Sequence, residues 1–299
     1  MKRIGTYIIL SLLVIMFSCE KEITLDLPSS SDKLVVEGVI EEGQFPYVIL
    51  TKNASYFDKV DSSTIMNMIV FNAKVTVTDG TQTDSLQLAF DPFQLPYIKY
   101  VGSTIRGEVG KKYHLKIELD DRIYTASTTI PNPVQLDSIK FKFVDDQTDS
   151  LGLIWIYFFD PDTQGNYYRG YTKTLNKDFV FVHPYSSVSD DRLINGQPVT
   201  YTLNRGWDPN QGDQYFEDDN TTPWWAFVIG ETVVVKFCSM DAGHFDFWYS
   251  VEQQMATDGN PFASPTSVRT NISGGALGVW GGYGVYLDTI KIEGDNISY

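Results

Sequence analysis

Apolar and polar residues alternate along much of the first half of the chain. Residues 73–78 alternate strictly, and Asp79-Gly80 directly after them is typical of a tight turn between two strands. Residues 112–119 alternate again before a second turn at Asp120-Asp121. Short strands at close spacing, with turn residues between them, indicate an antiparallel sandwich. We therefore expect residues 33–130 to form an immunoglobulin-like domain.

The pattern changes at Pro131-Asn132-Pro133, which we interpret as a domain boundary because proline cannot continue a central strand ladder. Residues 151–159 form a long apolar and aromatic run, which is typical of a buried strand. A capping aspartate and an apolar face predict one helix near residues 241–258. We expect a mainly β chain whose second domain, residues 131–299, is β-rich with this one notable helix.

The N-terminus has the pattern of a secretory signal. A basic start precedes an apolar run over residues 4–17, and the chain turns polar directly after Cys19. A membrane-spanning helix needs about 20 apolar residues, which is more than this run provides. We expect residues 1–18 to be a lipoprotein signal peptide and residues 19–32 to be the lipid anchor and a flexible tether, with Cys19 as the lipid-bearing first residue of the mature chain.

Lipid attachment at Cys19 would hold the protein stably at a membrane, because each buried methylene of an acyl chain contributes about 0.8 kcal/mol. No later segment is long and apolar enough to span a bilayer. A cleaved signal without lipid is the alternative, because Met16 and Phe17 depart from the usual leucine-small-small-cysteine pattern.

Charge narrows the classes of partner. The chain has a net charge of −15, and removal of the signal leaves 21 basic against 38 acidic residues, or −17. Such a balance argues against nucleic acid and against docking on anionic lipid through a basic patch. The chain has two cysteines. If Cys19 carries lipid, Cys238 has no partner for a disulfide, and we expect it to be a small buried hydrophobe in a strand.

Catalytic signatures are missing from the sequence. The three histidines, His114, His183 and His244, are far apart, and no zinc, phosphate-loop or nucleophile-elbow motif is present. We expect His114 to be exposed on a strand, no cofactor and no enzymatic activity. A serine-histidine-aspartate triad could still assemble in space, so a hydrolase remains a second alternative.

Two neighbouring segments are candidates for ligand binding. Asp208, Asn210 and Asp213 supply the oxygen ligands that calcium prefers, although their order departs from a known calcium loop and a solvated acidic loop is the alternative. Trp224 and Trp225 follow this loop and could form a platform for a glycan or peptide. The alternative is that they pack in the core beside an apolar run.

Several segments in order along the chain resemble a known family. They are residues 19–23, 33–38, 190–196, 260–262 and 271–280. Together they resemble Bacteroidetes outer-membrane lipoproteins catalogued as a domain of unknown function and associated with TonB-dependent receptors. The resemblance covers nearly the whole mature chain and carries no catalytic residues with it.

This resemblance implies an accessory outer-membrane lipoprotein that helps a TonB-dependent transporter capture or admit its ligand. Glu20 and Glu22 are similar to the acidic signals that send such lipoproteins to the cell surface, although Lys21 lies between them, so the periplasmic face stays open. The alternative function is a free-standing surface lipoprotein that binds a glycan or peptide.

Overall fold

The computed structural model describes residues 33–53, 67–92, 97–144, 151–206, 223, 225–257, 267–293 and 297–298. The chain divides into two units, Met1–Ser31 and Asp32–Tyr299, and all described residues belong to the second. In this part of the chain, no helix is long and apolar enough to cross a membrane.

Strands account for most of the regular structure, which confirms the expectation of a mainly β fold. In chain order the elements are β1 (Leu34–Glu41), β2 (Tyr47–Lys52), β3 (Lys74–Thr78), β4 (Thr83–Phe90), β5 (Ile98–Val101), β6 (Lys112–Leu119), β7 (Arg122–Thr129), β8 (Ser138–Phe143), β9 (Leu151–Phe159), β10 (Tyr167–Thr174), β11 (Val188–Asp190), β12 (Pro198–Leu203), β13 (Phe227–Val228), β14 (Thr232–Met240), α4 (Ala242–Thr257), β15 (Leu277–Lys291) and β16 (Ile297–Ser298).

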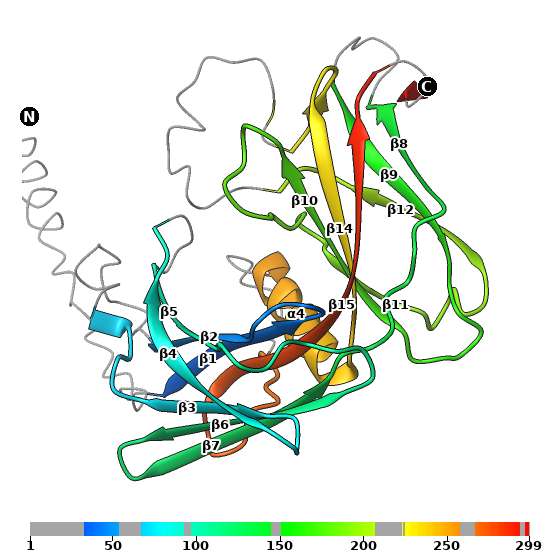
Figure 1. Ribbon diagram of the computed structural model, residues 1–299. Coiled ribbons are helices and arrows are strands. Elements are labelled where there is room, and N and C mark those ends of the chain that lie inside the picture. The colour runs from blue at the N-terminus through cyan, green and yellow to red at the C-terminus, as the bar shows by residue number, and fades with distance from the viewer. Residues whose placement is uncertain are drawn as a thin grey trace, which may run out of the picture. The chain divides into compact units, whose positions relative to one another are not determined.

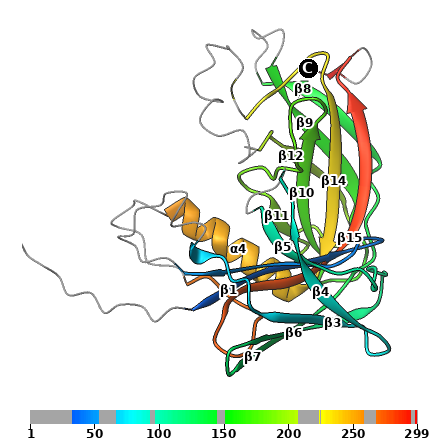
Figure 2. The same ribbon diagram turned by 60° about the vertical axis from the view of Figure 1, so that its left-hand side comes forward.

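One large sheet runs through most of the described residues. Its eleven strands follow the order β11-β10-β14-β15-β1-β2-β5-β4-β3-β6-β7. A smaller sheet has the order β12-β9-β8-β16, with β13 also paired to β9. Figures 1 and 2 both show β15 running from beside β1 to beside β14, so this strand joins the two regions of the large sheet.

The first core lies inside the curled end of the large sheet. Side chains of β1 and β2 pack in one cluster with side chains of β3, β6 and β7, as in a sandwich. Trp280 of β15 is completely buried in this cluster, and its indole Nε1 donates a hydrogen bond to the carbonyl oxygen of Tyr113 at 3.2 Å. The amides of Thr125 and Ser273 each donate to the other residue's carbonyl oxygen, which joins β7 to the segment before β15.

The predicted boundary at Pro131-Asn132-Pro133 does not separate two sheets. β1, at the start of the predicted first domain, pairs in parallel with β15 near the C-terminus. Gly278 permits this pairing, because it has a φ of +106° and a Cβ there would overlap the backbone of Val36. Alternation within one strand does not reveal a partner that lies more than two hundred residues away, so the sequence could not predict this connection.

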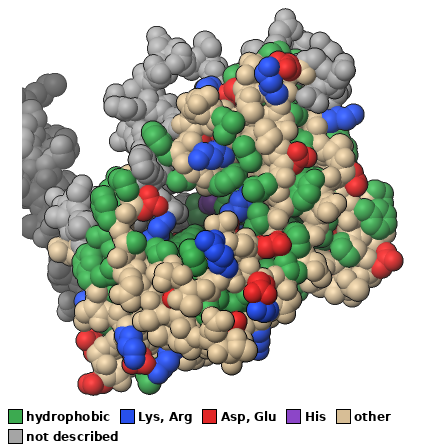
Figure 3. Space-filling model, in the orientation of Figure 1, with side chains coloured by type: hydrophobic (Ala, Val, Ile, Leu, Met, Phe, Trp, Pro, Cys, Tyr) green, Lys and Arg blue, Asp and Glu red, His purple; other side chains and the backbone are tan. Residues whose placement is uncertain are grey.

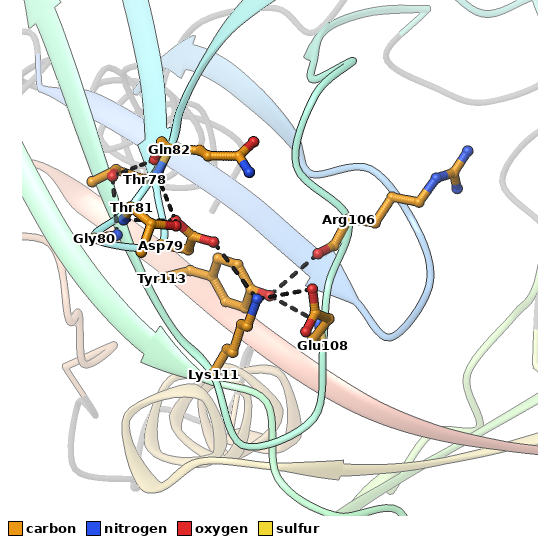
Figure 4. Close-up of polar contacts among 9 residues, drawn as sticks. All are labelled: Thr78, Asp79, Gly80, Thr81, Gln82, Arg106, Glu108, Lys111 and Tyr113. Atoms are coloured by element: carbon orange, nitrogen blue, oxygen red, sulfur yellow. Dashed lines mark hydrogen bonds and ion pairs between the residues drawn. The ribbon is translucent and has the colours of Figure 1, made fainter.

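The predicted turn at Asp79-Gly80 is confirmed as the connection between β3 and β4 (Figure 4). The Asp79 carboxylate accepts hydrogen bonds from the amides of Gln82 and Thr81 at 2.8 and 2.9 Å and from the Thr81 hydroxyl at 2.8 Å. These bonds, with the backbone amide of Gln82 first, lower the pKa of Asp79 to about 2. Lys111 links this turn to the next loop through ion pairs with Asp79 and Glu108 at 3.8 and 2.9 Å.

The helix predicted near residues 241–258 is confirmed as α4, and Asp241 is its N-cap. One oxygen of the Asp241 carboxylate accepts a hydrogen bond from the amide of His244 at 2.9 Å. The other oxygen accepts hydrogen bonds from the Thr128 hydroxyl and from the amide of Thr129, the latter at 3.2 Å. The cap therefore also attaches the start of α4 to the end of β7.

Candidate functional site

One face of five neighbouring strands carries charged and tyrosine side chains. Strand register places Arg169 beside Cys238, Tyr171 beside Lys236, Tyr283 beside both Met240 and Glu41, and Tyr47 beside Val39. Because side chains of directly paired residues lie on the same side of a sheet, these residues share one face. We define the charged face as Glu37, Glu41, Tyr47, Arg169, Tyr171, Lys236 and Tyr283.

The opposite face of the same strands is apolar, and this difference fixes the orientation of the charged face. Tyr168 and Phe237 stack with ring centroids 5.2 Å apart and pack with Phe158 in the second core cluster. Since successive strand residues point to opposite sides, burial of Tyr168 and Phe237 turns Arg169 and Lys236 the other way.

Arg169 lies at the centre of the charged face, beneath α4. Its side chain is only 2 % exposed, and its guanidinium carbon lies 3.7 Å from the ring centroid of Trp248. The guanidinium donates hydrogen bonds to the hydroxyl of Ser187 at 3.0 Å and of Tyr283 at 3.3 Å. Among the described residues, no carboxylate lies within ion-pair distance of it.

A carboxylate nevertheless compensates the Arg169 charge indirectly, through one bridging residue. Glu252 of α4 accepts hydrogen bonds from the hydroxyl and the amide of Ser187 at 2.5 and 2.9 Å. Ser187 therefore links the guanidinium to Glu252, and Trp248 covers the guanidinium from the same helix. Moving α4 away would leave the buried charge of Arg169 without these partners, which is costly. The contacts with Trp248 and Glu252 therefore hold α4 over the face.

Lys236 forms the second charged centre. Its side chain pairs with the Glu41 carboxylate, and Nζ lies 5.3 Å from the ring centroids of both Tyr171 and Phe181. Burial on its own would lower the pKa of Lys236, but Cys238 and Glu41 raise it above the ordinary value. Because burial raises the pKa of the Cys238 thiol to about 12, that thiol is neutral near pH 7, and Glu41 is the charge that acts there.

Glu37 and the tyrosines of the face are shifted toward their neutral forms. Burial raises the pKa of Glu37, while the charge of Arg169 opposes the change. Burial, followed by the charges of Glu37 and Glu41, raises the pKa of the Tyr47 hydroxyl. The Tyr171 and Tyr283 hydroxyls lie 3.0 Å apart. At neutral pH the face therefore presents phenol hydroxyls beside a lysine–glutamate pair.

Figure 3 shows a hollow in the middle of the described surface, with a histidine and a lysine or arginine side chain visible inside it. Glu41, Tyr47 and Tyr171 of the charged face are half-buried, and the Lys236 side chain is 11 % exposed, so solvent reaches part of this face. Partly exposed tyrosines around a charge pair can bind a polar ligand by stacking and hydrogen bonds.

Most residues that the sequence predicted as a site lie outside the described residues. These are Cys19, Asp208, Asn210, Asp213 and Trp224. Their roles in lipid attachment, metal binding and ligand binding stay predictions. Within the described ranges, no group of three or more histidine, cysteine or acidic side chains is placed to hold a metal ion.

Trp225 is the one member of the predicted platform that the structure describes. It is half-buried, and its carbonyl oxygen accepts a hydrogen bond from the amide of Arg205 at 2.9 Å. The Arg205 side chain in turn forms a buried ion pair with Asp178 at 2.5 Å. The backbone of Trp225 is thus attached to a buried ionic contact.

The expectations for Cys238 and His114 are confirmed, since Cys238 is completely buried and His114 is exposed on β6. His183 Nδ1 lies 3.0 Å from the carbonyl oxygen of Pro184. His244 is completely buried, and burial lowers its pKa to about 3. In the described part of the chain, no imidazole is hydrogen-bonded to a serine, cysteine or carboxylate side chain.

The sequence analysis missed the charged face, although one signal was available. Arg169 lies between Tyr168 and Gly170, and Lys236 lies between Val235 and Phe237, so each is a cation whose two sequence neighbours carry no charge. Such residues are rarely buried without a partner. Identifying the partners required the register among β1, β10, β14 and β15.

Comparison with protein families places the chain in a known group. A family described as a domain of unknown function (DUF4249) matches residues 20–287. The chain belongs to the DUF4249 family. The match starts one residue after Cys19 and includes every residue of the charged face of this DUF4249 protein. A search of curated proteins found no match.

Proposed function

We propose that this protein is a non-enzymatic lipoprotein of the outer membrane, an accessory subunit that docks on a TonB-dependent transporter and helps capture or admit its ligand. The proposal rests on the resemblance to Bacteroidetes lipoproteins associated with such receptors. The observation that carries it is the position of the family match, which starts at residue 20, directly after the cysteine that ends the apolar leader. The whole matched body would then lie beyond the anchor.

The charged face supports a role in binding. It combines half-buried tyrosines with the pair of Lys236 and Glu41, and polar groups of both signs suit contact with a ligand or a partner protein. Arg169, Ser187 and Glu252 hold α4 in place beside it. A site fixed by such contacts needs little rearrangement when it binds.

Copurification tests the proposal directly. The full chain with a C-terminal tag is produced in its own cells, the membranes are solubilised in mild detergent, and captured proteins are identified by mass spectrometry. We expect a TonB-dependent receptor in amounts comparable with the tagged chain. Cys19→Ala should reduce that recovery severalfold at equal protein level, because an unanchored body meets the receptor less often. Recovery of the tagged chain without any such receptor contradicts the proposal.

A free-standing binder of glycan or peptide is the second candidate, and the half-buried Trp225, Tyr47 and Tyr171 favour it. This candidate predicts that the mature chain alone binds on a glycan or peptide array. Trp224→Ala and Trp225→Ala should weaken binding if the predicted platform is used, whereas Tyr47→Ala should weaken it if the charged face is used. Binding that all three variants leave unchanged contradicts both versions.

A further inference from the structure

A separate cavity opens where the described body begins. It has a volume of about 330 Å³ and lies between the start of β1, the end of β2 and the turn that joins β6 to β7. The charged residues that line it are Lys33, Lys52, Asp120, Asp121 and Arg122, and Tyr124 lies beside them. None of these residues belongs to the charged face.

The five charged side chains of this cavity are all exposed, and none forms an ion pair or a side-chain hydrogen bond with any described residue. Nearby charges behave differently. Glu118, close to the same turn, pairs with Lys116 at 2.5 Å and with Lys74 at 3.7 Å. The cations and carboxylates around the cavity are therefore available to a ligand.

Charge and size restrict what this ligand can be. The chain as a whole has a net charge of −15, so a uniformly anionic surface would repel it. A small group that carries both a phosphate and an ammonium suits three cations and two carboxylates at one cavity. The volume of about 330 Å³ lies at the lower end of the range for ligand pockets, roughly 300–1,000 Å³, which suits a group of headgroup size.

The position of the cavity adds a second argument, which rests on the proposed function because it needs lipid at Cys19. Lys33 is only fourteen residues after Cys19. Fourteen residues span at most about 50 Å even when fully extended. An acylated Cys19 would therefore keep the cavity within that distance of the bilayer, where the local concentration of headgroups is high and weak binding suffices.

We propose that this cavity binds the phosphoethanolamine headgroup of a membrane phospholipid and so docks the β6–β7 end of the body on the bilayer. Lys33, Lys52 and Arg122 contact the phosphate, and Asp120 and Asp121 accept hydrogen bonds from the ammonium. A choline headgroup has no N–H to donate, so these carboxylates distinguish the two lipids. Figure 3 shows charges of both signs at the lower left, over this end of the body.

Vesicle binding by the full mature chain with Cys19→Ser tests this proposal without an acyl group. Cosedimentation should be stronger with vesicles that contain equal parts phosphatidylethanolamine and phosphatidylcholine than with phosphatidylcholine alone. The double variant Lys52→Gln/Arg122→Gln should weaken binding to the mixed vesicles at least about ten-fold, because each cation donates charged hydrogen bonds to the phosphate. Circular dichroism of this variant should match that of the parent.

Lys112→Gln/Lys140→Gln is the matched control, since it removes the same charge from exposed lysines elsewhere and should leave binding unchanged. Equal binding to both kinds of vesicle, or equal losses in the two double variants, overturns the proposal. Binding of inorganic phosphate to the cavity without any binding to vesicles also overturns the proposal, because the ligand would then be a free phosphate. Because the tested chain carries no lipid, these results do not depend on whether Cys19 is acylated in cells.

Discussion

At the scale of single residues, Asp79 shows how one carboxylate fixes a turn. Its folded-state pKa of about 2 lies below the ordinary value of 3.8, so the ionised form stabilises the folded chain. This contribution is fully present above about pH 4 and is lost as the pH falls through about 2. The sequence predicted this turn because all the hydrogen-bond donors to the Asp79 carboxylate lie within three residues of it along the chain.

Asp79→Asn should lower the melting temperature at pH 7 and should weaken the dependence of stability on pH between 4 and 2. The neutral side-chain oxygen of asparagine accepts hydrogen bonds from the backbone N–H groups of Thr81 and Gln82 less strongly than an ionised carboxylate does. Thermal unfolding followed by circular dichroism across this pH range measures both effects. Asp137→Asn, at an exposed carboxylate without side-chain hydrogen bonds to described residues, is the control and should change neither.

Gly281 is a second position where a single atom decides the packing. A Cβ at this residue of β15 would overlap the buried imidazole of His244. Gly281→Ala should therefore destabilise the protein by at least about 2 kcal/mol in urea unfolding. Gly243→Ala is the control and should be neutral or stabilising, since its Cβ would meet no atom closer than 3.4 Å, with Asn271 and Asp241 as its nearest neighbours. Equal stability of the two variants would contradict this packing.

At the scale of elements, α4 depends on contacts at both of its ends. Asp241 caps the first turn and also binds Thr128 and Thr129 of β7, whereas Glu252 binds Ser187. The sequence predicted the helix and its cap, because capping is local. It could not predict the contact with β7, because more than one hundred residues separate the two.

Asp241→Ala should lower the free energy of unfolding by about 2–3 kcal/mol, since it removes the cap and leaves the Thr128 hydroxyl without its acceptor. Urea unfolding measures the change, with the parent and the variants fitted to one shared m-value, the slope of the free energy of unfolding against urea concentration. Asp246→Ala on the same helix removes an exposed ion pair with Arg269, which lies beyond the helix, and should cost less than about 1 kcal/mol. A smaller loss for Asp241→Ala than for Asp246→Ala would rule out the double role.

The individual strands show where sequence reasoning succeeds. Strands β3 and β6 and the long strand β9 were predicted because each alternates or is apolar within its own length. The parallel pairing of β1 with β15 was not predicted, because the residue pattern within either strand does not identify its pairing partner. The same limit hid the charged face, whose members come from β1, β2, β10, β14 and β15.

At the scale of the whole molecule, the pair of Glu41 and Lys236 connects the beginning of the described body to its C-terminal half across β15. Because Lys236 is only 8 % exposed, Glu41→Gln leaves a largely buried cation without its partner. The free energy of unfolding of this variant should fall by about 2 kcal/mol. The loss is smaller than for a fully buried ion pair, because Glu41 is partly exposed.

The double variant Glu41→Gln/Lys236→Met should recover most of this loss, since it removes the unpaired charge along with its partner. Chemical unfolding of the parent, both single variants and the double variant gives the coupling energy of the pair. Additive losses, without recovery in the double variant, would show that the two residues do not compensate each other.

Both proposals on function begin from an acyl group on the residue that follows the leader. Mass spectrometry of the processed amino-terminal peptide, from chain produced in its own cells, measures this directly. We predict a mature chain that begins at Cys19 with added acyl mass and that stays with the outer membrane on fractionation. A mature chain that begins at any other residue, or that carries no lipid and is recovered in the soluble fraction, would contradict the account.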